Sequence, residues 1–156
     1  LNTPLISSNK GAENAIMVGL ITPDQNVEQT KEYLDELEFL AATSGITVLK
    51  RFTQRVQRSD QKTFVGKGKL EEITTYVLDN PVDSVIFDDD LSPSQVRNLE
   101  AEFKETKVLD RSLLILNIIS QRAQTDQSKQ QVELAQYQYS HPLLTRLWSH
   151  CILQSG

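Results

Sequence analysis

The sequence has very little of several features that mark specialised classes of protein. It holds one cysteine, Cys151, in 156 residues, which excludes an internal disulfide framework and is typical of a reducing compartment. Its longest apolar-rich stretch, residues 113–119, is far shorter than the roughly 18 residues of a membrane span. No signal-peptide pattern opens the chain. These absences predict a cytoplasmic protein without a membrane span.

Histidine is almost as scarce as cysteine. His141, His150 and Cys151 lie near one another in sequence, but a zinc site needs four ligands with recognisable spacing, so their adjacency is more simply incidental. Two histidines near the chain end also specify no Ser/His/Asp geometry. We therefore predict neither a metal site nor a catalytic residue in this chain.

A phosphate-binding loop of the form Gly-x-x-x-x-Gly-Lys-Ser/Thr (Walker A) is absent as well. The Gly66-Lys67-Gly68-Lys69 cluster lacks both its leading glycine and its hydroxyl residue. The acidic run Asp88-Asp89-Asp90 looks like the magnesium-holding end of a nucleotidase strand. Without a phosphate loop, these acids more simply stabilise a strand-to-helix junction, at about 0.3–1 kcal/mol each. A nucleotide-binding α/β domain with weak ATP or GTP hydrolysis of its own is the alternative.

What the chain does contain is an alternation of buried strands and amphipathic helices. Apolar, β-rich runs predict four strands, at residues 15–21, 46–56, 82–87 and 107–110. Helical patterns lie between them, at residues 27–44 before Gly45, from the Gly66–Lys69 cluster to about residue 80, and at 93–105. This order predicts an α/β fold, a small four-stranded parallel sheet with flanking helices. The α/β subdomain should span residues 15–110, after a flexible tail at 1–14.

The predicted helix at 93–105 has the clearest start signal in the sequence. Ser92, Pro93 and Gln95 occupy the N-cap, the first helical position and the third, which together form a capping box. This start follows a buried strand and the acids Asp88–Asp90. Open α/β sheets bind ligands where the carboxyl ends of strands meet new helices. The junction is therefore a place to look for a site.

From Arg111 to about Tyr139 the sequence contains no proline or glycine. That allows one helix of about 28 residues, ~42 Å long. Its first part is apolar enough to pack on the sheet, through Leu113, Leu114, Leu116, Ile118 and Ile119, and its later part is rich in glutamine. We predict a long projecting helix over residues 111–150, half of an α-hairpin, and an atypical tail at 151–156. A helix-mediated dimer is another way to cover such a helix.

Charge is distributed unevenly along this chain of net charge −5. The acidic average argues against a general nucleic-acid binder, but residues 50–69 hold seven basic side chains and one acid, Asp60. A basic segment in an acidic body is a candidate anion-binding site, and a solvated loop that offsets neighbouring acids is the alternative. The basic residues are Lys50, Arg51, Arg55, Arg58, Lys62, Lys67 and Lys69.

Six motifs resemble the HflX family of ribosome-associated GTPases, in the right order over residues 15–150. They are TFVGKGKLEE at 63–72, VIFDDDLSPSQVRNLE at 85–100, VLDR at 108–111, IISQRA at 118–123, QVELAQ at 131–136 and LTRLWSH at 144–150. In that family the region is an N-terminal domain, made of a small parallel α/β subdomain and an α-hairpin, and a GTPase domain follows. Family members bind the large ribosomal subunit, and the hairpin reaches toward the peptidyl-transferase region.

The resemblance implies a non-catalytic ribosome- and rRNA-binding domain that works in translation, ribosome splitting or rescue. GTP and magnesium are implied only for the GTPase domain of the parent protein. The implied RNA contacts are the seven basic residues of segment 50–69 together with Arg122, Lys129, Arg146 and Trp148. Leu143 stands where the family usually has a basic residue, and 151–156 resembles nothing in the family. We therefore expect a fragment or a truncated product.

Overall fold

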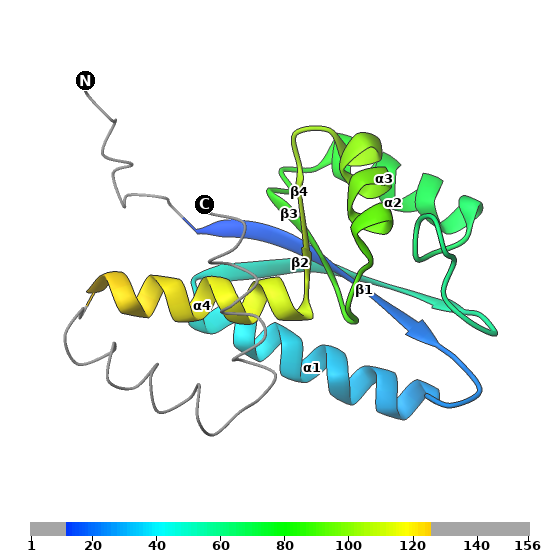
Figure 1. Cartoon of the computed structure of the whole chain (residues 1–156), viewed down its shortest axis with the longest axis horizontal. Coiled ribbons are helices and arrows are strands. Elements are labelled where there is room, and N and C mark those ends of the chain that lie inside the picture. Colours follow the sequence, from blue (N-terminus) through cyan, green and yellow to red (C-terminus); the bar gives the residue numbers. More distant parts are fainter. Residues whose placement is uncertain (1–11, 126–156) are drawn as a thin grey trace.

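Four strands and four helices alternate along residues 12–125, the part of the chain that the computed structural model describes (Figure 1). The strands are β1 (Glu13–Ile21), β2 (Ile46–Arg55), β3 (Ser84–Phe87) and β4 (Lys107–Asp110). The helices are α1 (Val27–Thr43), α2 (Lys67–Asp79), α3 (Pro93–Phe103) and α4 (Arg111–Thr125). All strands pair in parallel, in the order β2-β1-β3-β4. The predicted α/β fold with a four-stranded parallel sheet is confirmed.

The chain winds both ways from β1, which places helices on both faces of the sheet. One core contains Ile16 and Val18 of β1 with buried residues of α2 and α3, and the other contains Ala15 and Met17 with buried residues of α1 and α4. Right-handed crossovers in opposite directions put α1 and α2 on opposite faces. Since both faces are covered, β1 is apolar from Ala15 to Ile21 rather than alternating. The carboxyl ends of all four strands share one edge.

Several predicted boundaries were wrong by about two residues. β1 begins at Glu13 rather than residue 15, because Glu13 and Asn14 already pair with Ile46 and Thr47 of β2. The predicted tail was therefore too long. β3 begins at Ser84 rather than residue 82, because the Val82 N–H donates to the Asn80 carbonyl in a turn. Backbone hydrogen bonds determine these strand ends, and the pattern of apolar residues in the sequence does not reveal such bonds.

An irregularity in β2 explains why this strand alternates loosely. Ala15 pairs with Val48 and Ile16 pairs with Lys50, so Leu49 is an extra residue in the ladder. A bulge of this kind exchanges the two faces of the strand beyond it. Val48 therefore packs in the core that contains α1, whereas Phe52 packs in the core that contains α2. Beyond the bulge, consecutive basic residues of β2 face opposite sides of the sheet.

Helix ends largely follow the predicted signals. Gly45 follows α1 with φ of +78°, a conformation that glycine adopts without strain, as a C-terminal cap requires. α4 begins at Arg111 and buries Leu114 and Ile118, while Leu113 is exposed, contrary to the expectation that it packs on the sheet. The remainder of the predicted long helix, the tail and the proposed dimer contact lie outside the described residues. Within residues 12–125, no helix is long and apolar enough to span a membrane.

Candidate functional site

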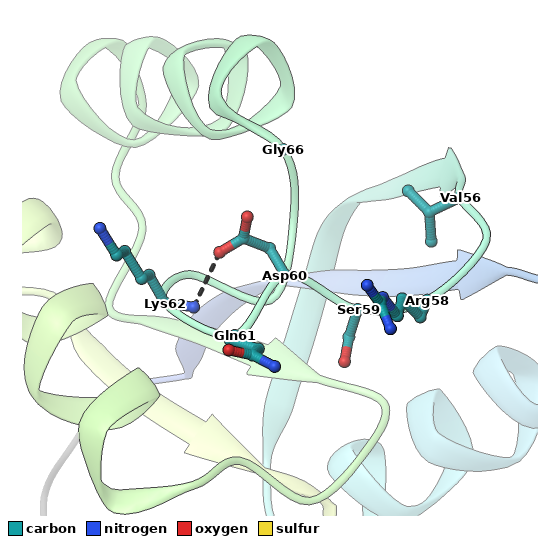
Figure 2. Close-up of a pocket in the computed structure, with 7 residues that line it drawn as sticks. All are labelled: Val56, Arg58, Ser59, Asp60, Gln61, Lys62 and Gly66. Atoms are coloured by element: carbon teal, nitrogen blue, oxygen red, sulfur yellow. Dashed lines mark hydrogen bonds between the residues drawn. The ribbon is translucent and has the colours of Figure 1, made fainter.

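The loop between β2 and α2 encloses an open hollow at the carboxyl edge of the sheet (Figure 2). Its volume is about 600 Å³. Polar and charged side chains make up most of its lining, which consists of Val56, Arg58, Ser59, Asp60, Gln61, Lys62 and Gly66. Two of the basic residues that the sequence singled out, Arg58 and Lys62, thus line one concave surface.

Asp60 shapes this loop from within. Its carboxylate accepts hydrogen bonds from the backbone N–H groups of Lys62 at 2.8 Å and Thr63 at 3.0 Å. These bonds, that of Lys62 first, hold the pKa of Asp60 below its ordinary value. Asp60 and Phe64 also exchange both backbone hydrogen bonds. The one acid in the basic segment is therefore committed to the loop's own amides.

Phe64 closes the loop in an uncommon backbone conformation, with φ of +67°. Its ring is buried and packs edge-on against Phe87 of β3, with centroids 5.4 Å apart. A positive φ is unfavourable for a bulky residue, and burial of the ring offsets it. Packing of the Phe64 ring in the core therefore holds the loop together with the hydrogen bonds of Asp60.

Helix α3 clamps the same loop through its first turns. The Gln95 side chain completes the capping box with Ser92, and its Nε2 also donates to the Asp60 carbonyl at 2.7 Å. Asn98 Nδ2 donates to the Lys62 carbonyl at 3.0 Å. The capping box was predicted from the sequence, but its second contact joins residues 35 positions apart. Nothing in the local pattern contains that contact.

The N-terminus of α2 lies at the edge of the hollow. Gly66 is its N-cap and makes no side-chain cap, while its own N–H donates to Gln54 Oε1 at 2.9 Å. A Cβ at Gly66 would lie 3.0 Å from Gln54 Nε2, so the close approach favours glycine. The first amides of a helix carry a partial positive charge. Backbone and side chains therefore combine to make this edge electropositive.

The basic segment does not form one patch, because three of its residues have partners inside the domain. Arg51 bonds to two acids of α1, Asp35 at 2.7 Å and Glu38 at 3.3 Å. Hydrogen bonds from Arg51 first, and then Lys31, hold the pKa of Asp35 below its ordinary value. The other two contacts are Lys69 with Glu72 at 3.0 Å and the Lys50 ammonium near the rings of Phe52 and Tyr76 at 5.0 and 5.2 Å.

Of the remaining four cations of the segment, Arg58 and Lys62 line the hollow, Arg55 ends β2 and Lys67 begins α2. Within residues 12–125, no acid forms an ion pair with Arg55, Arg58, Lys62 or Lys67. Arg122 lies in the last turn of α4, well apart in sequence. The three other residues implied as RNA contacts, Lys129, Arg146 and Trp148, lie outside the described residues. The local cationic set is therefore smaller than the sequence indicated.

The acidic strand end contacts α4, a different helix from the one that sequence predicted. Asp88 forms an ion pair with Arg111, the first residue of α4. Asp90 accepts a hydrogen bond from the Ser112 hydroxyl at 2.6 Å. Asp110 accepts from the backbone N–H of Leu113 at 2.8 Å and thus caps α4. These acids contact the first three residues of α4, which we call the root of α4, and do not converge on a common site.

The same acids give no sign of a cation site in the part of the chain that is described. Asp89 Oδ1 accepts from the Asp90 backbone N–H at 2.8 Å, so the three acids have separate partners. Among residues 12–125 no three His, Cys, Asp or Glu side chains are arranged to hold a metal ion. The positions of the two histidines and Cys151 lie outside that range.

Comparison with known proteins decides the family. The protein-family model described as GTP-binding GTPase N-terminal matches residues 31–120, and the one described as GTP-binding GTPase Middle Region matches residues 122–156. Among curated proteins, GTPase HflX of Flavobacterium psychrophilum is 49% identical over 144 residues. The chain belongs to the HflX GTPase family. GTPase HflX of Escherichia coli is 40% identical over 145 residues.

These HflX relatives are much longer than the present sequence. Each alignment covers 92% of this chain, but only 35% of the Flavobacterium protein and 33% of the E. coli protein. The chain thus spans about a third of the length of the curated relatives it matches. Its matches are to the N-terminal and middle regions of that family.

Solved structures support the fold. A GTP-binding protein from the hyperthermophilic archaeon Sulfolobus solfataricus, in complex with GDP, is 22% identical with a TM-score of 0.57. The similarity covers 92% of this chain and 42% of that one. At this identity the likeness concerns fold alone. It agrees with the α/β architecture derived from the strands and helices above.

Proposed function

We propose that this chain is the ribosome- and rRNA-binding N-terminal domain of an HflX-type GTPase that acts on the large ribosomal subunit. Its role would be in ribosome splitting or rescue during translation in the cytoplasm, and the domain itself would be non-catalytic. GTP and magnesium would be bound by the GTPase domain of the parent protein. The observation that carries the proposal is the hollow at the carboxyl edge, with Arg58 and Lys62 in its lining.

The chemistry of that edge suits a phosphodiester backbone. Phosphate oxygens accept hydrogen bonds from Arg, Lys and backbone amides, and such contacts position a protein on RNA without reading sequence. The uncapped start of α2 adds a partial positive charge beside Lys67. Clamps from Gln95 and Asn98 hold the loop in shape, so little ordering is required on binding.

Cosedimentation with large ribosomal subunits tests the proposal. We expect the double variant Arg58→Ala/Lys62→Ala to bind about tenfold more weakly than the wild-type chain, since it removes two cations of the hollow that form no ion pair with an acid within residues 12–125. The matched control is Arg51→Ala/Lys69→Ala, which removes two cations that already have acidic partners. Equal loss in both double variants would reduce the effect to net charge and contradict the assignment of the hollow. Wild-type binding by both double variants would also contradict the assignment of the hollow as a ribosome-binding site.

A second candidate function is nucleotide binding at the same edge, favoured by the Gly66–Lys69 cluster at the uncapped start of α2. Calorimetry of the chain with ATP and GTP in the presence of magnesium separates the two functions. Heat of binding at high micromolar nucleotide, lost in Arg58→Ala/Lys62→Ala, would favour this candidate. If no heat of nucleotide binding is measured and ribosome binding is retained, the nucleotide-binding candidate is excluded and the RNA-binding function is supported.

A further inference from the structure

The start of α4 is tied to the carboxyl edge of the sheet by three polar contacts. Asp88, which follows β3, pairs with Arg111, Asp90 accepts from the Ser112 hydroxyl, and Asp110 of β4 accepts from the backbone N–H of Leu113 at 2.8 Å. The Arg111 guanidinium also lies 5.4 Å from the centre of the Tyr33 ring on α1. Three different elements therefore meet at the first residue of α4.

The inner contact of this group is unusual because it is buried and incompletely satisfied. The Asp88 side chain is 1% exposed, and its Oδ2 has no hydrogen-bond partner among the described residues. Burial raises the pKa of Asp88, and the nearby acids Asp89 and Glu36 raise it further, while Arg111 opposes the rise. A pair in such a place contributes little to stability, since desolvation offsets the attraction.

A buried pair that adds little stability can still specify geometry. Arg111 is 39% exposed and could reach solvent, yet its guanidinium is held between the Asp88 carboxylate and the Tyr33 ring. Asp88 directly follows β3 and Tyr33 lies on α1, so the two partners hold the guanidinium from two different elements. Leu114 and Ile118 then seat the following turns against the sheet. The ion pair thus fixes the first residue of α4, and the apolar contacts fix the turns that follow.

We propose that the Asp88–Arg111 pair is a latch that sets the direction in which α4 leaves the sheet, and that α4 detaches from its root when the latch opens. Residues 122–156, which begin in the last turn of α4, match the middle-region model of the family, so α4 leads into that region of the sequence. Arg111 is in this sense a positioning residue. The latch does not depend on whether the domain binds RNA.

Hydrogen exchange on the full 156-residue chain tests the latch. We expect Asp88→Asn and Arg111→Gln each to speed exchange of α4 amides from residue 115 onward by about tenfold, while exchange of the β1 amides stays unchanged. The double variant should exchange no faster than either single variant, because both remove the same contact. Arg111→Lys retains the charge and should restore much of the protection.

The matched control is Asp89→Asn, which makes the same charge change one residue along at an exposed side chain. It should leave α4 exchange at the wild-type rate. Unchanged α4 exchange in Asp88→Asn and Arg111→Gln would overturn the proposal. Faster exchange spread equally over β1 and α4, or failure of Asp88→Asn to fold, would also overturn it, because the pair would then support the whole core.

Discussion

Arg51 and Arg58 belong to one basic segment, yet their surroundings differ completely. Arg51 bonds to Asp35 and Glu38 on α1, whereas Arg58 lines the hollow without an acidic partner among the described residues. The bulge in β2 and the crossover to α1 bring Arg51 to its acids, and neither is visible in a run of charges. Sequence therefore locates a concentration of cations, but only tertiary structure decides which of them can meet a ligand.

Two aspartates should affect stability with opposite pH dependence. The pKa of Asp88 is raised in the folded state, so its stabilising contribution is complete below the unfolded value near 3.8 and is lost as pH rises through the folded pKa. We expect the free energy of unfolding of Asp88→Asn, relative to wild type, to increase as pH rises above about 3.8 and then level off. Urea denaturation from pH 3.5 to 7.5 measures this.

Asp60 provides the comparison for that pH series. Its pKa is lowered by backbone N–H groups, so its contribution is present above the unfolded value near 3.8 and is lost as pH falls through the folded pKa. Asp60→Asn should therefore be less stable than wild type near neutral pH, by less than about 1 kcal/mol, and should approach wild type in acid. The same direction of change in both variants would contradict the assigned environments.

At the scale of elements, local signals predicted well and long-range contacts did not. The order of strands and helices, the capping box of α3 and the glycine after α1 all follow from short patterns. The bulge at Leu49, the positive φ of Phe64 and the clamp from Gln95 arise from packing between distant segments. The acids Asp88–Asp90 were correctly placed at a junction, but the helix they hold is α4.

The second contact of Gln95 makes a direct prediction about α3. Gln95→Ala removes the reciprocal cap and the clamp on the Asp60 carbonyl, so we expect it to destabilise the domain by about 1–2 kcal/mol. The backbone amides of the loop should also exchange faster. Thermal denaturation and hydrogen exchange measure the two effects.

Helix α1 contains a matched control for this substitution. Asn26 and Gln29 form the same capping box, and within residues 12–125 the Gln29 side chain makes no further hydrogen bond. Gln29→Ala should cost only about 0.5–1 kcal/mol and leave the loop amides at the wild-type exchange rate. Equal effects of the two substitutions on the loop would mean that the clamp does not hold the hollow.

At the scale of the whole molecule, the carboxyl edge of the sheet carries two separate features. A cationic hollow lies at the β2 end, and the acidic root of α4 lies at the β3 and β4 ends. Helix α3 stands between them and contacts the loop of the hollow through Gln95 and Asn98. The fold thus separates the proposed anion-binding surface from the start of α4.

The salt dependence of binding to the large ribosomal subunit tests the central proposal most directly. If Arg58 and Lys62 contact phosphates, the slope of log affinity against log salt should be shallower in Arg58→Ala/Lys62→Ala by roughly 1.4–1.8 units, since each contact releases about 0.7–0.9 counterion. Arg51→Ala/Lys69→Ala should keep the wild-type slope. A slope unchanged in the first double variant, or lowered equally in both, would contradict phosphate binding at the hollow.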